Sequence, residues 1–198
     1  MAEVIRNVLT SLYQQLNAAI LVACLASFTL LYVEEHGIKK SIKVWWNRIR
    51  SDKEFRRVIY LVFYTGMILF RTLLCRPYYT NTLGNVLGNW YIKDEAGKLY
   101  TEGIENVILF IPFTLLLLWA VKKELKNNKF TYLITVSFGI SFGLSVFIES
   151  LQLFLKLGGF QLSDLFFNSL GGVIGGILFY ICKLAKGGKR IDKGKYDG

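Results

Sequence analysis

The chain has 198 residues, of which 53% are hydrophobic, 15% aromatic and 19% charged, and its formal net charge is +10. This apolar content excludes a disordered chain. The single histidine, His36, excludes His-based triads and multi-histidine zinc sites within one chain. The three cysteines (Cys24, Cys75 and Cys182) are too scattered for a disulfide scaffold or a thiolate metal site. We therefore predict neither a metal nor a cofactor.

The apolar residues form long blocks, which is typical of membrane proteins. A hydrocarbon core of about 30 Å requires about 20 mostly apolar helical residues per crossing. We predict an all-α, polytopic transmembrane helix bundle of about five spans, because hydrocarbon offers no partners to unpaired peptide groups. The predicted spans are residues 16–33, 58–74, 104–121, 131–154 and 164–184.

An amphipathic segment lies between the first two predicted spans. Ile38, Ile42, Trp45 and Ile49 recur at helical spacing, while the neighbouring lysines and arginines point elsewhere. We expect a short helix on the cytoplasmic surface of the membrane, with an ordinary solvated linker as the alternative. The predicted organisation is an N-terminal span with this basic segment (1–57), a four-helix membrane domain (58–184) and a basic cytoplasmic tail (185–198).

Lysine and arginine residues alternate between the connections. Eight lie between the first and second spans and four between the third and fourth, and the C-terminal tail is also basic. The other connections hold at most three. Because basic connections remain in the cytoplasm, we expect a multi-pass protein of the bacterial cell membrane with its N-terminus outside and its C-terminus inside. The net charge then needs no nucleic-acid partner.

Polar residues occur inside four of the predicted spans. An ionisable group at the middle of a membrane helix costs about 2.5–3.5 kcal/mol, so each should have a partner or a task. With the predicted orientation, all of them lie within about 10 Å of the outer boundary. A network that only holds the bundle together is an equally good interpretation of the polarity alone. The residues are Arg71, Glu105, Asn106, Glu149, Gln152, Asp164 and Asn168.

Helical spacing places many of these residues on common faces. A stripe on the fourth span is predicted to face the bundle interior, and Asp164 and Asn168 begin a similar stripe on the fifth. Glycines spaced four apart are expected to let these two helices pack closely as a hairpin. The fourth-span stripe contains Ser141, Ser145, Glu149, Gln152 and Lys156, and the glycines are Gly139, Gly143, Gly171, Gly172, Gly175 and Gly176.

Three ordered motifs carry a family resemblance. They are Asn106 with Phe110-Ile111-Pro112-Phe113, then Glu149 with Gln152, then Asp164 with Asn168 and Gly171-Gly172. Over residues 104–180 the chain resembles the VanZ-like family, and residues 1–57 lie outside this likeness. The resemblance implies an integral membrane protein associated with low-level teicoplanin resistance, without a settled mechanism. Gly158 and Gln161 replace an arginine and an acidic residue of many members. If that arginine holds an anionic group in those members, either Arg71 or Lys156 does so here or the ligand differs.

The leading hypothesis is an outer-leaflet polar pocket that binds membrane lipids or a lipid-linked cell-wall precursor. Glu149 and Asp164 would form its acidic pair, with Arg71 as counter-ion. Asn106, Gln152 and Asn168 would orient the ligand by hydrogen bonds. An aromatic connection would cover the mouth of the pocket, and its residues are Tyr78, Tyr79, Trp90, Tyr91 and Tyr100.

Two alternatives remain open. Glu149 and Asp164 in a low-dielectric site could act as catalytic acid and base on a lipid-linked substrate, which would make the protein an enzyme. A structural subunit of a membrane complex is the other alternative, because glycine-lined faces also suit partner helices. The sequence leaves the ligand, the oligomeric state and the presence of catalysis undetermined.

Overall fold

The computed structural model describes residues 2–34, 37–74, 81–91, 93, 101–125 and 129–193. This part of the chain forms six α-helices and one π-helical turn and contains no β-strand, as the predicted all-α class requires. The elements are α1 (Ala2–Glu34), α2 (Ile38–Ser51), α3 (Lys53–Leu69), the π-helical turn η1 (Phe70–Leu74), α4 (Glu102–Ala120), α5 (Phe130–Leu155) and α6 (Leu162–Lys193).

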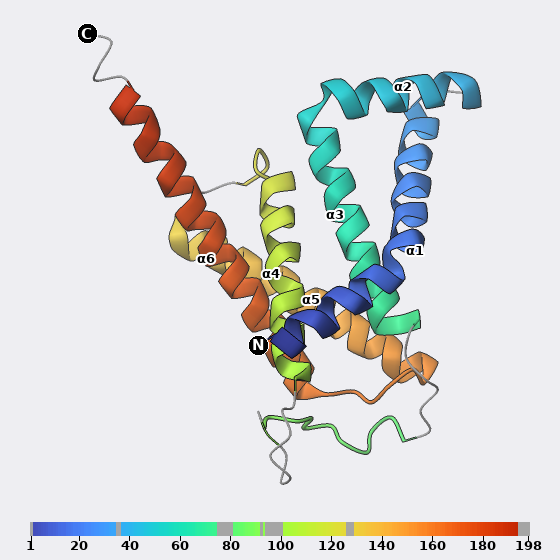
Figure 1. Ribbon diagram of the computed structural model, residues 1–198, viewed down its shortest axis with the longest axis vertical. Helices are drawn as coiled ribbons and strands as arrows, with labels where there is room; N and C mark the ends of the chain where they lie inside the picture. The colour runs from blue at the N-terminus through green and yellow to red at the C-terminus, as the bar shows by residue number, and fades with distance from the viewer. Residues whose placement is uncertain are drawn as a thin grey trace.

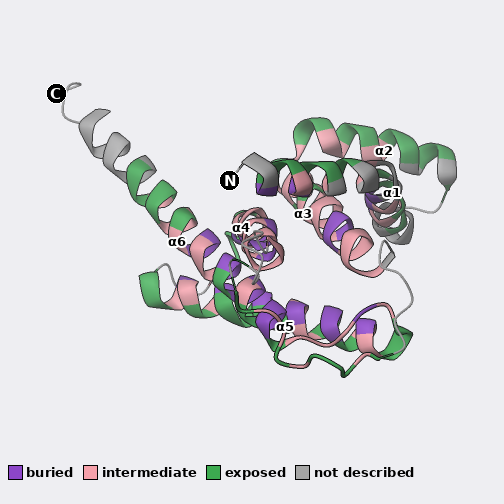
Figure 2. Ribbon diagram, turned by 60° about the horizontal axis from the view of Figure 1, so that its bottom comes forward, coloured by how far each residue is buried: buried purple, intermediate pink, exposed green. Residues whose placement is uncertain are grey.

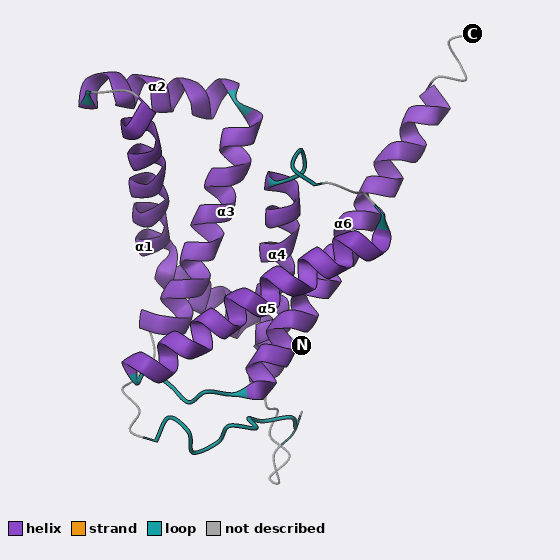
Figure 3. Cartoon of the chain, turned by 180° about the vertical axis from the view of Figure 1, so that it is seen from behind, coloured by secondary structure: helices purple, strands orange, loops and turns teal. Residues whose placement is uncertain are grey.

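The helices form two groups that meet at α3 and α4. In the first group α1 and α3 run antiparallel, and α2 lies across their ends (Figures 1 and 3). In the second group α6 packs on both α4 and α5. A small apolar core joins the groups, and its buried residues are Ile68, Leu109, Phe110, Phe113 and Ile148. One end of the molecule therefore carries α2, and the opposite end carries the 81–91 segment (Figure 1).

Three helices in the described chain are long and apolar enough to cross a membrane: α4, α5 and α6 as far as Ala185. They correspond to the last three predicted spans. The predicted second span falls on α3, which has 17 residues and continues as η1. The first falls within α1, which already begins at Ala2. These two crossings, and hence a total of about five, stay predictions.

The amphipathic segment forms the expected helix, α2. One residue, Asp52, separates it from α3, and the Asp52 carboxylate accepts hydrogen bonds from the backbone N–H groups of Glu54 (2.8 Å) and Phe55 (3.2 Å). Aspartate at this position satisfies N–H groups that the first turn of a helix leaves unpaired. The sharp corner between α2 and α3 is thus a property of this sequence, whereas the surface position of α2 remains a prediction.

Two glycines of α6 allow the backbone of α4 to approach. A Cβ atom on Gly171 would collide with the Val107 carbonyl, and one on Gly175 would lie 2.7 Å from the Ile111 carbonyl oxygen. The expectation of close packing at these positions is confirmed, and α4 is contacted as well as the predicted partner α5. It is wrong for Gly139 and Gly143, where an added Cβ would meet nothing within 4 Å. Both lie on the face of α5 turned away from α6.

Candidate functional site

A buried polar stripe runs along α5. Ser137, Ser141, Ser145, Glu149 and Gln152 are each at most 1% exposed, at steps of four, four, four and three residues. Figure 2 shows the buried residues of α5 gathered on one side of the helix. The predicted stripe is confirmed up to Gln152.

The stripe does not include Lys156, which was expected to continue it. The helix ends at Leu155, and Lys156 is an exposed cap residue in the left-handed conformation, with φ of 55°. A lysine in this position does not hold an anionic group inside the cluster.

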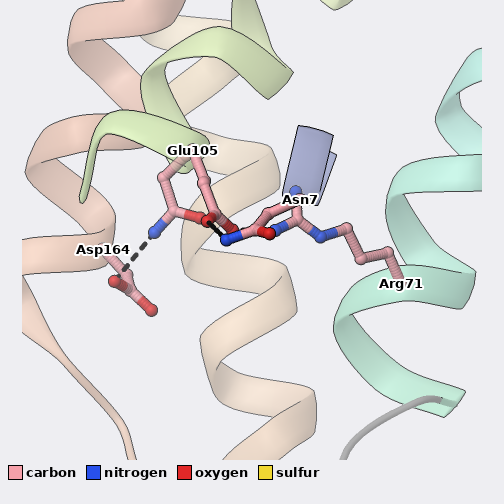
Figure 4. Close-up of polar contacts among 5 residues, drawn as sticks. Asn7, Arg71, Glu105 and Asp164 are labelled. Carbon is pink, nitrogen blue, oxygen red and sulfur yellow. Dashed lines mark hydrogen bonds and ion pairs between the residues drawn. The ribbon is translucent and has the colours of Figure 1, made fainter. Parts of the chain in front are cut away.

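The charged pair of the site joins η1 to α4. The Arg71 Nη2 atom lies 2.7 Å from Glu105 Oε2, and Asn7 of α1 donates to Glu105 Oε1 at 3.4 Å (Figure 4). The Arg71 and Glu105 side chains are 17% and 12% exposed. Arg71 thus pairs with Glu105, whereas the expected acidic pair was Glu149 and Asp164.

A buried amide joins α4 to α6. Asn106 Nδ2 donates to Asp164 Oδ1 at 2.9 Å, and Figure 4 shows this contact beside the Arg71–Glu105 pair. Asn106 is 9% exposed and Asp164 3%. Because Asn106 follows Glu105 directly, the first turn of α4 connects the charged pair with the carboxylate of α6.

Gln152 connects α5 with the π-helical turn. Its Nε2 atom donates to the backbone carbonyl of Thr72 at 2.8 Å. A π-helical turn alters the regular hydrogen-bond ladder and is often found at functional sites. Since a carbonyl can only accept, the orientation of the Gln152 amide follows from this bond.

The remaining contacts join α5 to the start of α6. Asn168 Nδ2 lies 2.9 Å from Ser145 Oγ, and the Glu149 carboxylate accepts the backbone N–H of Gln161 at 2.9 Å. Glu149, Asp164 and Asn168 are all at least 95% buried. Each predicted site residue takes part in one of these polar contacts between helices. We refer to the residues that make them together as the polar cluster: Arg71, Glu105, Asn106, Ser145, Glu149, Gln152, Asp164 and Asn168.

Three buried atoms of the polar cluster lack a hydrogen-bond partner among the described residues: Arg71 Nη1, Gln152 Oε1 and Asn168 Oδ1. An unpaired buried polar atom costs about 1–3 kcal/mol. One donor and two acceptors, contributed by η1, α5 and α6, are therefore left without a protein partner in this part of the chain.

The described part of the aromatic connection covers the beginning of α6. Thr82 and Val86 accept backbone hydrogen bonds from Phe160 (2.9 Å) and Leu162 (2.8 Å). The Trp90 ring contacts Phe166 and Phe167, with centroids 5.3 and 5.9 Å apart. The cover over a pocket mouth stays a prediction. Tyr91 is 76% exposed, and Tyr78, Tyr79 and Tyr100 fall outside the described residues.

No group of three or more histidine, cysteine, aspartate or glutamate residues in the described ranges is placed to hold a metal ion. Cys24 and Cys182 are exposed free thiols, while His36 and Cys75 are not among the described residues.

Sequence reasoning missed two features of the site. Asn7 reaches the Arg71–Glu105 pair because α1 begins at Ala2, well before the predicted first span. The partner role of Ser145 was not assigned, although its place on the α5 stripe indicated burial. Glu105 was recognised as polar and at the right depth, and no role was given to it.

Comparison with known proteins decides the family. The sequence profile of VanZ/LLP1 matches residues 18–183. The chain belongs to this family. The match includes the second half of α1 and all of α2, so the expectation that residues 1–57 lack family support is wrong for residues 18–57. The motifs in the later spans had signalled the same VanZ-like family.

A curated relative agrees with this assignment. The chain is 30% identical over 94 residues to Protein VanZ of Enterococcus faecium. The aligned region covers 48% of this chain and 53% of that protein, so the chain spans about half the length of the curated relative that it matches. No solved structure matches. The sequence is thus that of a VanZ-like membrane protein.

Proposed function

We propose that this VanZ-like protein binds the headgroup of an amphiphilic cell-envelope molecule at the polar cluster, within the outer leaflet of the bacterial membrane. The ligand would be a membrane lipid or a lipid-linked cell-wall precursor. Altered access to this molecule would lower susceptibility to teicoplanin-type glycopeptide antibiotics, which act at the outer surface on wall precursors.

One observation carries the proposal: among the residues that the structure describes, nothing pairs with the buried atoms Arg71 Nη1, Gln152 Oε1 and Asn168 Oδ1. They come from η1, α5 and α6. A network that served only to hold the bundle together would be expected to satisfy its own buried atoms, because hydrocarbon cannot. A headgroup with an anionic oxygen for Arg71 and hydroxyl or amine hydrogens for the two amides would pair all three.

The outer location rests on charge. The most basic connection contains α2, which lies at the opposite end of the molecule from the 81–91 segment (Figure 1). With α2 on the cytoplasmic side, the polar cluster lies towards the exterior. This orientation is part of the proposal. In a cysteine-free background, an impermeant maleimide should label Gly159→Cys and spare Lys122→Cys on intact cells.

The function is tested by expression in a glycopeptide-susceptible Gram-positive host. The chain should raise the inhibitory concentration of teicoplanin, and Asp164→Asn and Gln152→Ala should reduce that gain. Glu124→Gln is the matched control. Glu124 is an exposed carboxylate just beyond the C-terminal end of α4, whereas the cluster residues of α4 lie near its N-terminus. The proposal is overturned if both cluster variants accumulate in the membrane at normal levels and protect fully.

The same assay separates binding from acid–base catalysis. Glu149→Gln and Asp164→Asn preserve the shape of the side chain and one acceptor oxygen, so a binding site should retain partial activity. A reaction that needs these carboxylates for proton transfer would instead lose about 10²-fold or more.

A further inference from the structure

An apolar groove lies between α1, α2 and α3. Figure 3 shows α2 lying across the ends of α1 and α3 at one end of the molecule. The volume of the groove is about 290 Å³, close to the lower limit of about 300 Å³ for small-molecule sites. The surface that it presents is apolar. The groove belongs to the helices of the first group and is independent of the polar cluster. Its lining includes Ala23, Cys24, Trp45, Ile59, Tyr60 and Phe63.

Two polar groups of the groove lining, Trp45 and Ser27, are hydrogen-bonded to each other. The Trp45 indole N–H donates to Ser27 Oγ at 2.7 Å, and the Ser27 hydroxyl donates to the Cys24 carbonyl at 2.9 Å. Indole and hydroxyl each have one donor hydrogen, so both donors are used. Ser27 is 1% exposed. These bonds fix α2 against α1 and leave a lining suited to a hydrocarbon chain.

Positive charge lies at the α2 end of the groove. Arg56 follows the helical spacing of Ile59 and Phe63, which places it on the groove-lining side of α3. Its Nη1 atom donates to the Ile49 and Arg50 carbonyls at 2.8 and 2.7 Å, so the guanidinium lies at the C-terminus of α2. Lysines and arginines of α2 add charge without any acidic residue in that helix, and the exposed ones include Lys39, Lys43 and Arg50.

We propose that this groove binds one acyl chain of an anionic phospholipid. The lipid belongs to the leaflet on which α2 lies. Its chain contacts Trp45 and Phe63, and its phosphate lies among Arg56 and the cations of α2. An apolar channel that ends in a basic surface is complementary to such a lipid, because each nearby cation strengthens the attraction to an anionic headgroup.

Quenching of Trp45 fluorescence tests this proposal. The full chain with Trp46→Phe, Trp90→Phe and Trp119→Phe retains Trp45 alone and is placed in phosphatidylcholine vesicles. These vesicles contain either chain-brominated phosphatidylglycerol or chain-brominated phosphatidylcholine, and the two brominated lipids are compared at the same mole fractions. We expect saturable quenching, with an apparent affinity for phosphatidylglycerol at least about fivefold higher, the contribution of one cation near the surface.

Two variants separate the groove from the charge. Cys24→Phe fills the groove and should abolish the saturable component, whereas the neighbouring control Leu25→Phe, also exposed and outside the lining, should retain it. The triple variant Lys39→Gln, Lys43→Gln and Arg50→Gln should lower the apparent affinity for phosphatidylglycerol to that for phosphatidylcholine. Equal quenching of the parent by both lipids, or no quenching by either, would overturn the proposal. Saturable quenching of Cys24→Phe at the level of the parent would also overturn it.

Discussion

The two groups of helices use their interiors differently. The α4–α6 group buries serines, amides and carboxylates along α5 and α6 and brings backbones together at Gly171 and Gly175. The α1–α3 group presents an apolar groove and places its charges at the α2 end. Buried polar side chains require hydrogen-bond partners at defined positions on neighbouring helices, whereas an apolar groove requires only a ligand of complementary shape. The first arrangement therefore suits recognition of a headgroup, and the second suits a hydrocarbon chain.

The largest effect on the free energy of unfolding should distinguish the buried charged pair from the exposed one. Arg71→Gln should lower the free energy of unfolding by about 2–3 kcal/mol, because the Glu105 carboxylate then loses a charge-assisted hydrogen bond. The exposed Lys123–Glu54 pair, whose side chains are 72% and 46% exposed, is the comparison. Its coupling should be at most about 1 kcal/mol.

Double-mutant cycles on both pairs, measured by reversible unfolding in detergent micelles, check this difference. The cycles use Arg71→Gln with Glu105→Gln and Lys123→Gln with Glu54→Gln. Equal coupling in the two pairs would contradict the distinction between the buried cluster and the surface.

Glycine substitutions should sharpen the same contrast within the α4–α6 group. Gly171→Ala should destabilise the protein by about 1–3 kcal/mol, because its Cβ meets the Val107 carbonyl and the backbones must separate. Gly143→Ala faces open space and should be neutral or stabilising by up to about 1 kcal/mol, since alanine favours a helix over glycine. Thermal unfolding of both variants decides the sign, and a stabilising Gly171→Ala would refute the close packing of α4 and α6.

The smallest effect is expected at the corner of the α1–α3 group, and only in acid. Backbone N–H groups of Phe55 and Glu54 hold the pKa of Asp52 below its ordinary value. The folded state then favours the carboxylate, so this stabilisation is present above the ordinary carboxyl pKa and disappears as pH falls through the lowered value. Asp52→Asn keeps a cap without a titrating group and should weaken the pH dependence of unfolding below pH 5. The same pH dependence of unfolding below pH 5 in Asp52→Asn and in the parent would contradict this role of the Asp52 carboxylate.

The buried face of the polar cluster could be predicted from sequence because it depends on helical spacing. Helical spacing placed Ser141, Ser145, Glu149 and Gln152 on one face, and all four are buried. The motif residues Asn106 and Asp164, which come from different helices, contact each other directly.

Partners and packing faces could not be predicted in the same way. The rotation of each helix about its axis is set by packing, so spacing alone does not separate Gly143, which faces open space, from Gly171. The π-helical turn that carries Arg71 and presents the Thr72 carbonyl to Gln152 has no evident signature in its sequence. The reach of Asn7 depends on where α1 begins, and boundaries are the least certain part of a sequence-based assignment.

The single residue between α2 and α3 has a consequence for how this protein can tolerate length changes. Asp52 is the one residue between these helices, with φ of −97° and ψ of 110°. Each residue inserted or deleted within α2 after Trp45 would turn the preceding part of that helix by about 100° relative to α3. A one-residue indel would therefore swing the indole out of register with Ser27 and rotate lysines towards lipid. Replacement of Asp52 by another capping residue can therefore be tolerated, whereas the insertion or deletion of one residue cannot.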